Sequence, residues 1–445
     1  MSVNDKLAKV IIFALLAFMF YGRSTVANEN KCNGTEVSEY EVLNIGGLFA
    51  IHGQRKNRTS LCGPFRMGGF EELNAMLFAV SKVNEDRNIL PGIKLQVKVE
   101  DTCSSMELAT EKSLNYTIIN YQSIYKCFGN HSTQDKPILA IVGERNSDIS
   151  RAVTNLVGLF HIPVISYGAT SSSLSGVKYF TRTIAPDTFA TQALVDVIQR
   201  FRWNYIILLH SDSEYGRFAA DSFREKLRKG KKNICTAVDE HINEEMTEGL
   251  QITWQKIDKE KHNTKVVVVF ATYEDFSGFL QTGKGKYDLE EYIWLSSDMW
   301  NGQTANLTCL LKHAISVIPN QIYIQEFAKF FQNAQKNLHY LKQHSTFSES
   351  WFEEYNSLAE AEVKNKSSCV VWGSSEVSYV VDAVYTIAWA LHGILKCDNT
   401  TKSCNKSEAK NFFKRYKNQI YEYYTVQFAL PSWLPWPFHG KPNAI

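Results

Sequence analysis

Four short polar clusters supply most of the side chains in this sequence that could do chemistry. They are ERNSDIS (144–150), GATSSS (168–173), HSDSEYG (210–216) and SSDMW (296–300), and each lies at the end of an apolar run. Hydroxyl and backbone N–H groups in such loops can hold an anion, and carboxylates can hold an ammonium group. One cluster alone would be a polar turn. Four at corresponding places predict one binding site lined from several strands.

Motifs for catalysis or for a structural metal are missing from the sequence. It contains no GxSxG, HExxH, P-loop or Rossmann fingerprint, so an enzyme is not predicted. The nine cysteines include no CxxC pair, and no histidine lies at metal-ligand spacing, which argues against a zinc site. The net charge of +2 gives no electrostatic case for nucleic acid. The clusters therefore predict binding of a small ligand without a cofactor.

The elements that must position these clusters alternate between apolar strands and amphipathic helices. This alternation is typical of parallel sheets covered on both faces, which bind ligands beyond the carboxyl ends of their strands. We therefore predict an α/β fold, divided into two lobes because 445 residues exceed one usual core. The expected strands are 44–53, 94–101, 138–143, 162–167, 205–210, 233–240, 265–270 and 292–297, and the expected helices are 70–86, 148–160, 188–200, 216–229, 246–259 and 274–282. Asp382 and His392 interrupt the apolar segment 377–395, so a buried core helix is favoured there over a membrane span.

The N terminus and the glycosylation pattern indicate a chain of the secretory pathway. Lys6 and Lys9 precede a short apolar run and a small-residue cleavage pattern, so residues 1–27 are predicted to be a signal peptide, with a signal anchor as the alternative. The Asn-x-Ser/Thr acceptors are Asn33, Asn57, Asn115, Asn130, Asn306, Asn365, Asn399 and Asn405. The odd number of cysteines leaves at least one free or intermolecular thiol.

Longer phrases carry a family resemblance. They include NAMLFAVSKVNED followed by ILPGIKL and DTC, LVGLFHIPVISYGATSSSLS, YFTRTIAPDTFATQALVDVIQRFRWNY and WLSSDMW. Through these phrases the chain resembles, from about residue 40 to 410, the extracellular ligand-binding region of class C G-protein-coupled receptors. This class includes the calcium-sensing, basic amino-acid and metabotropic glutamate receptors.

The resemblance implies a bilobed clamshell of the type I periplasmic-binding-protein kind. Lobe 1 would comprise residues 40–185 and 315–425, and lobe 2 residues 187–313. A free α-amino acid would bind between the lobes and favour their closure. Two chains would pair through lobe 1 as a homodimer or heterodimer, and a G protein would be a partner only if the full gene encodes a transmembrane region.

The resemblance also assigns ligand-binding residues to both lobes. They are Ser147, Gly168, Ala169, Thr170, Asp187, Tyr215 and Asp298. Ser147 and the loop around Thr170 would hold the ligand's carboxylate, while the two aspartates and the tyrosine ring would hold its ammonium group. By residue type alone, Ser147 and Asp187 could also be helix N-caps.

Two acidic residues depart from the glutamate-receptor pattern. Those receptors take the ligand's distal carboxylate with two basic residues, and the matching positions here hold Glu72 and Glu376. Glutamate would meet like charge, so we predict against glutamate as the agonist. The two acids could instead pair with the side chain of lysine, arginine or ornithine, help hold calcium as a co-ligand, or be solvated helix-face carboxylates.

The cysteines follow the family pattern in part. That pattern pairs Cys62 with Cys103 and Cys397 with Cys404, and makes Cys127 a candidate for an intermolecular disulfide. Partners for Cys32, Cys235, Cys309 and Cys369 stay open.

Residues 426–445 form a proline-rich tail with no strand or helix period, and the family's cysteine-rich module and seven transmembrane helices do not follow. We expect either a truncated or mis-spliced gene model or a secreted form. The predicted function is that of a receptor ectodomain at the extracellular face of the plasma membrane. A secreted amino-acid-binding or decoy protein is the alternative.

Overall fold

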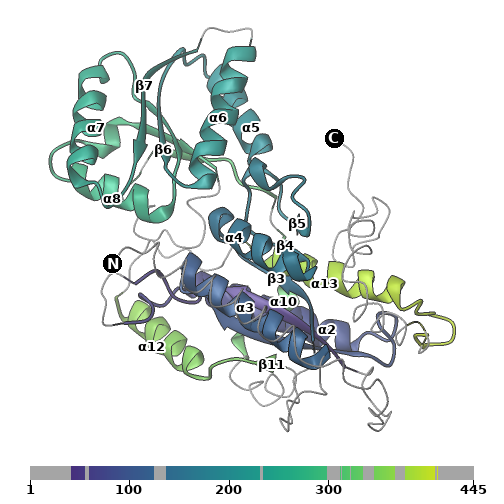
Figure 1. The fold of residues 1–445 in the computed structure, drawn as a ribbon. Coiled ribbons are helices and arrows are strands. Elements are labelled where there is room, and N and C mark those ends of the chain that lie inside the picture. Colours follow the sequence, from purple (N-terminus) through teal and green to yellow (C-terminus); the bar gives the residue numbers. More distant parts are fainter. Residues whose placement is uncertain are drawn as a thin grey trace, which may run out of the picture. The chain divides into compact units, whose positions relative to one another are not determined.

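The structure, a computed structural model, describes part of the 445-residue chain. The described residues are 42–55, 60–124, 137–230, 234–297, 311, 313–320, 322–333, 345–365, 376–405 and 408. Cys127, Asp298, the predicted signal peptide and the predicted tail lie outside them. The described elements form two parallel sheets, each with its own helices (Figure 1).

The first sheet has the strand order β11-β2-β1-β3-β4-β5, and all neighbouring strands are parallel. Its strands are β1 (Val42–Phe49), β2 (Lys94–Asp101), β3 (Ile138–Val142), β4 (Val164–Ser166), β5 (Phe180–Arg182) and β11 (Ser345–Thr346). The accompanying helices are α2 (Met67–Glu85), α3 (Met106–Ile124), α4 (Ser147–Val157), α10 (Gln325–Gln332), α12 (Ser350–Asn365) and α13 (Val377–Ile394), with short 3₁₀ helices η1 (Gly158–Phe160) and η2 (Ser172–Leu174). We call this unit lobe 1.

Different helices cover the two faces of the lobe-1 sheet, because successive strand residues point to opposite faces. Ile45 and Phe49 join a buried cluster with α2 and α13 on one face. Leu48 and Ile141 join a second cluster with α3 and α4 on the other. Since both faces are apolar, these strands are continuous apolar runs in the sequence.

The second sheet has the order β10-β9-β8-β6-β7 and is also parallel throughout. Its strands are β6 (Tyr205–Ser211), β7 (Cys235–Ile242), β8 (Val266–Phe270), β9 (Ile293–Ser296) and β10 (Ala314–Ser316), with helices α5 (Asp187–Arg200), α6 (Glu214–Lys229), α7 (Thr247–Glu260) and α8 (Tyr273–Gly283) and a 3₁₀ turn, η3 (Leu289–Glu291). Ile206 and Leu208 pack with α5 and α6, whereas Ile207 and Leu209 pack with α7 and α8. We call this unit lobe 2.

The predicted α/β fold with two parallel-sheet lobes is confirmed. Every expected strand and helix is present, with ends shifted by a few residues. The strands β5, β10 and β11 have two or three residues, too few to give an apolar run, and α10 has only eight residues. These four elements and the helices α3 and α12 are absent from the expected set. The second sheet extends to Ser316 in β10, three residues past the predicted end of lobe 2 at residue 313. The other lobe boundaries stay a prediction.

Helix α13 is a core helix of lobe 1. Among the described residues it is the helix that is long and apolar enough to cross a membrane, but half of that span is buried inside the protein. Val380 and Val384 lie in the same cluster as α2, as expected for a helix that covers a sheet. Burial raises the pKa of Asp382 to about 7, which keeps a carboxyl on this apolar helix partly protonated at neutral pH.

Two disulfides and several surface residues complete the description. Cys62 is bonded to Cys103, and Cys397 to Cys404. Cys235 is exposed and forms no disulfide among the described residues. Three glycan acceptors, Asn115, Asn399 and Asn405, are exposed, Asn365 lies in α12, and Asn33, Asn57, Asn130 and Asn306 lie outside the described residues.

Candidate functional site

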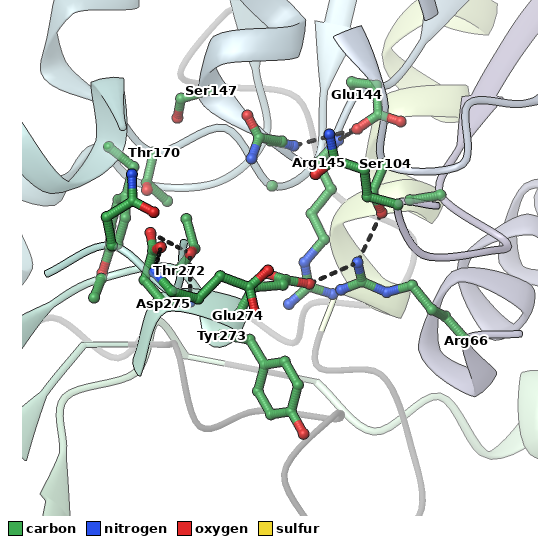
Figure 2. A pocket seen from close by; sticks show the side chains of 18 of the residues that line it. Arg66, Ser104, Glu144, Arg145, Ser147, Thr170, Thr272, Tyr273, Glu274 and Asp275 are labelled. Carbon is green, nitrogen blue, oxygen red and sulfur yellow. Dashed lines mark hydrogen bonds and ion pairs between the residues drawn. The ribbon is translucent and has the colours of Figure 1, made fainter. Parts of the chain in front are cut away.

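A cavity of about 430 Å³ is lined by segments that follow strands of both sheets (Figure 2). Lobe 1 contributes Ala50, Gln54, Arg66, Ser104, Glu144, Arg145, Asn146, Ser147, Gly168 and Thr170. Lobe 2 contributes Tyr215, Asn243, Glu244, Glu245, Ala271, Thr272, Tyr273, Glu274 and Asp275. A cavity of this size at the carboxyl ends of parallel strands is typical of a small-molecule site.

Ser147 lines the cavity as the first residue of α4. Its N-cap interpretation is wrong, because Asn146 caps the helix by accepting hydrogen bonds from the N–H groups of Asp148 (2.8 Å) and Ile149 (3.2 Å). The Ser147 hydroxyl accepts from the N–H of Ser171 at 3.2 Å. The N–H of Ser147 is left as the first helical donor that an anion at this wall could use.

The loop after β4 uses several of its own donors internally. The N–H groups of Gly168 (3.3 Å) and Ala169 (2.9 Å) both donate to the hydroxyl of Ser166. Ala169 is buried and does not line the cavity. Thr170 lines it, and its carbonyl accepts from the N–H of Asp187 at 2.9 Å. Thr170 is therefore the residue of this loop that can contact a ligand through its side chain.

Asp187 and Asp298 are not placed on the cavity wall by the described structure. Asp187 is buried as the first residue of α5, behind Thr170, and the N-cap of that helix is Pro186. Asp298 lies outside the described residues. Its neighbour Ser297 forms a 2.6 Å hydrogen bond with the hydroxyl of Tyr215, which does line the cavity.

Neither Glu72 nor Glu376 belongs to the described lining of the cavity. Both form ion pairs with Arg145, which does line it. Their exposed fractions are 1% and 2%, so the alternative of solvated helix-face carboxylates is wrong. The Arg145 guanidinium lies 2.7 Å from Glu72 and 2.9 Å from Glu376, and it does line the cavity. The cationic partner expected from a ligand or calcium is thus supplied by the protein itself.

Glu144, at the end of β3, is a further buried carboxyl beside this group. It accepts hydrogen bonds from the Thr102 hydroxyl and from the N–H groups of Arg145 (2.9 Å) and Asn146 (3.3 Å). Burial raises the pKa of Glu144 to about 7; the hydrogen bonds act against this shift, and the nearby Glu72 carboxylate adds to it. This carboxyl is therefore partly protonated near neutral pH.

The lobe-2 wall is acidic, which sequence reasoning missed. Glu244 and Glu245 follow β7, and Glu274 and Asp275 follow β8 at the start of α8. Asp275 accepts from the N–H of Glu244 at 3.0 Å and from the Thr272 hydroxyl at 2.8 Å. Burial raises the pKa of Asp275. The clue in the sequence is the same as for lobe 1, since these acids also follow expected strands.

Two sets of polar contacts join the lobes. In the first, the Glu214 carboxylate of α6 binds the Arg151 guanidinium of α4 and the Ser173 hydroxyl, and the N–H of Glu214 donates to Asp148 at 2.8 Å. In the second, Arg66 of lobe 1 lies 3.5 Å from Glu274 of lobe 2, and both residues line the cavity (Figure 2).

Comparisons with known proteins agree with this architecture. Residues 71–425 match the family model described as receptor family ligand binding region. The chain is 28% identical to a metabotropic glutamate receptor of Drosophila melanogaster, over 92% of the chain and 46% of the relative. It is also 28% identical to metabotropic glutamate receptor 4 of Mus musculus, over 79% of the chain and 41% of the relative. The chain thus spans less than half the length of these curated relatives.

The family match covers most of the chain, and the two parallel-sheet lobes fit a bilobed periplasmic-binding-protein-like fold. The chain therefore belongs to the receptor family ligand-binding regions, as a Venus flytrap region of the class C G-protein-coupled receptor type.

Proposed function

We propose that the chain binds a free α-amino acid in the cavity between its lobes. The observation that carries this proposal is that Thr170 and Ser147, the first residue of α4, both line the lobe-1 wall of the cavity. Neighbouring N–H groups of the loop donate to Ser166 and Ser147, so we assign the α-carboxylate to Thr170 and the N–H of Ser147.

The α-ammonium group would face lobe 2. Tyr215 offers a ring there, and Ser297 orients its hydroxyl. Asp187 does not line the cavity, so we assign it no direct contact. The acids of the lobe-2 wall supply the negative charge that an ammonium group requires.

The charge of the cavity favours a neutral or basic amino acid over an acidic one. Two guanidinium groups, of Arg66 and Arg145, line it against five carboxyl groups, of Glu144, Glu244, Glu245, Glu274 and Asp275. The relatives are named for glutamate, but in this cavity a second ligand carboxylate would meet an excess of like charge. We therefore propose an agonist other than glutamate.

We further propose that ligand-driven closure of the lobes signals at the extracellular face of the plasma membrane, in a pair of chains joined through lobe 1. Leu114 and Ile118 on α3 and Leu159 after α4 are exposed apolar residues that could form such an interface. Asn115 is exposed on the same helix, so a glycan there would compete with pairing. Light scattering of the secreted Asn115→Gln variant against the wild-type chain tests this point.

Isothermal titration of the purified full chain with individual amino acids tests the binding proposal. Thr170→Ala should weaken an active amino acid roughly 10- to 100-fold, because it removes a hydrogen bond to a charged group. Thr110→Ala is the matched control, since the Thr110 hydroxyl donates to the carbonyl of Met106 in α3 and does not line the described cavity. Binding left unchanged by Thr170→Ala, or no binding of any amino acid by the wild-type chain, would exclude the proposed site.

A further inference from the structure

We propose that His52 is a proton-binding site that couples the surrounding pH to the lobe-1 wall of the cavity. The protonated imidazole joins α12 to the segment after β1, and loss of its proton releases α12. We call His52, Asp101 and Glu354 the His52 clamp. Its effect on amino-acid binding rests on the proposed function, whereas the proton-dependent contact itself does not depend on that function.

Both nitrogens of the His52 ring face carboxylates from other elements of lobe 1. Nδ1 lies 2.5 Å from an oxygen of Asp101, the last residue of β2, and Nε2 lies 3.1 Å from an oxygen of Glu354 in α12. A neutral imidazole carries one N–H and can donate to only one of these carboxylates, whereas a protonated imidazole can donate to both. The arrangement therefore fits the charged form of the ring.

The groups packed around the ring favour this charged form. Burial by itself lowers the pKa of His52, but the hydrogen bonds and charges of Asp101 and Glu354 outweigh it, so the pKa is raised above its usual value of 6.5. The Phe65 ring meets the imidazole edge-on at 5.4 Å. Cys62 lies close by but is held in its disulfide and does not titrate. Arg66, next to Phe65, donates from its guanidinium to the Ser104 hydroxyl.

The two acids are held differently, so loss of the proton breaks one contact before the other. One oxygen of Asp101 accepts from the N–H groups of Ile51 (3.1 Å), His52 (3.3 Å) and Cys103 (2.9 Å), and 10% of its side chain is exposed. The Glu354 side chain is 45% exposed. A neutral ring that keeps its N–H toward Asp101 turns the lone pair of Nε2 to the Glu354 carboxylate, which repels it. The released element is therefore α12.

The clamp reaches the cavity through the segment that carries His52. Ala50 and Gln54, on either side of His52 in the sequence, line the cavity. The His52 carbonyl accepts from the Ser104 hydroxyl at 3.3 Å, and Ser104 also lines the cavity, where it accepts from Nη1 of Arg66 at 2.7 Å (Figure 2). A ring held at both nitrogens keeps this part of the wall ordered before a ligand arrives, which lowers the free-energy cost of binding.

The sign of the pH effect follows from the raised pKa. Stabilisation by the clamp is fully present below pH 6.5, the usual value for histidine, and is lost as pH rises through the higher value of the folded chain. Affinity for an amino acid should therefore fall as the pH rises across this range. Glu144 titrates near pH 7 as well, so the wild-type chain alone does not isolate the clamp. The comparison with Glu354→Gln does, because that variant retains Glu144.

NMR of the full chain with labelled histidine measures the ring titration, and the signal missing from His52→Gln assigns His52. Glu354→Gln should lower the pKa of this ring, because it removes one of the two carboxylates. Glu353→Gln, the exposed neighbour in α12, should leave that pKa unchanged. In calorimetric titrations with an amino acid that binds, the wild-type affinity should fall roughly two- to fivefold more between pH 6 and pH 8 than the affinity of Glu354→Gln.

A His52 pKa that is equal in the wild type and Glu354→Gln would overturn the clamp, whether or not a ligand binds. A lower pKa in Glu354→Gln, with the same pH dependence of affinity in both chains, would overturn the link to the cavity and leave the proposed function standing. If the wild-type chain binds no amino acid, the link to the cavity falls with the proposed function, and the ring titration still decides the proton-dependent contact.

Discussion

The lobe-1 and lobe-2 walls of the cavity hold their charged groups in different ways. On the lobe-1 wall, Glu144 is buried, and Arg145 is bound to the buried acids Glu72 and Glu376. On the lobe-2 wall, Glu274 keeps 40% of its side chain exposed, and its ion pair within the described part of the chain is with Arg66, at 3.5 Å. Arg145 on the lobe-1 wall is paired with acids inside the protein, whereas Glu274 on the lobe-2 wall stays partly solvated.

This difference suggests a division of roles. Buried, paired groups keep one geometry and a defined charge whether or not a ligand is present, so the lobe-1 wall can discriminate between ligands. Solvated carboxylates are screened and can reorient, so the lobe-2 wall can adjust to a ligand that lobe 1 already holds. Variants on the lobe-1 wall should therefore have larger effects than variants on the lobe-2 wall.

The largest expected effect concerns Glu144. The pKa of this carboxyl is raised from 4.5 to about 7 in the folded chain, so the folded state binds more protons than the unfolded state between these values. Stability from this group is therefore present at low pH and is lost as pH rises toward 7 and beyond. Glu144→Gln should remove that loss. The difference in unfolding free energy between Glu144→Gln and wild type should therefore shift in favour of the variant by up to about 3 kcal/mol between pH 5 and pH 8.

Differential scanning calorimetry of both chains at pH 5, 6, 7 and 8 measures this effect. Glutamine can donate to Thr102 and accept from the N–H groups of Arg145 and Asn146, so the hydrogen bonds are preserved. Glu107→Gln is the exposed control, since Glu107 lies on the surface of α3 and accepts a hydrogen bond from the Ser105 hydroxyl. A difference between wild type and Glu144→Gln that does not change with pH would show that the lobe-1 wall does not hold a buried titrating carboxyl.

The second expected effect concerns Gly168. Gly168→Ala places a Cβ against the stem of Arg145 and should destabilise lobe 1 by about 1–3 kcal/mol through overpacking. It should also weaken amino-acid binding, because the Arg145 guanidinium, which lines the cavity, must move from its two acids. Gly176→Ala gives a contrast, since no atom lies within 4 Å of the added Cβ and only its φ of 81° adds strain. Equal effects on amino-acid affinity from both variants would contradict a role for the Arg145 contact.

The sequence predicts the strands and loops that form this site better than it predicts which charged side chains pair with one another. The apolar runs of β1, β3 and β4 establish a parallel sheet, and the polar clusters after β3 and β4 locate Ser147 and Thr170 at its carboxyl edge. Which partner a buried acid takes is decided by contacts between segments far apart in the chain. Glu72, Arg145 and Glu376 are each separated by more than 70 residues, so no local pattern reveals that they form one group.

The missed lobe-2 residues have a different cause. Glu244 and Glu274 follow expected strands, as the recognised clusters do, but they resemble ordinary solvated charges at the start of helices. Strand ends in parallel sheets all point to one edge, so the rule that located Ser147 applies equally to them. Treating every segment after a strand as a candidate would have found this wall.

The third expected effect concerns the interlobe contact of Glu214. Its carboxylate, in a residue 8% exposed, binds Arg151 and Ser173 across the two lobes. Glu214→Ala should weaken amino-acid binding roughly 5- to 30-fold if this contact stabilises the ligand-bound arrangement, since it removes a partly buried charged pair. Glu225→Gln on the same helix is the control, because the pair of Glu225 with Lys229 is exposed. Titration in which both variants match the wild type would mean that the contact does not support binding.

The smallest expected effect concerns Arg66 and Glu274, the interlobe ion pair that lines the cavity. The pair is long at 3.5 Å, one partner is 40% exposed, and Arg66 already donates to the Ser104 hydroxyl at 2.7 Å. A double-mutant cycle with Arg66→Gln and Glu274→Gln should give a coupling energy for amino-acid binding below about 0.5–1 kcal/mol. This coupling should shrink further at high salt, because exposed charges are screened. A salt-insensitive coupling well above about 1 kcal/mol would show that the lobe-2 wall is held as firmly as the lobe-1 wall, and the proposed division of roles would no longer hold.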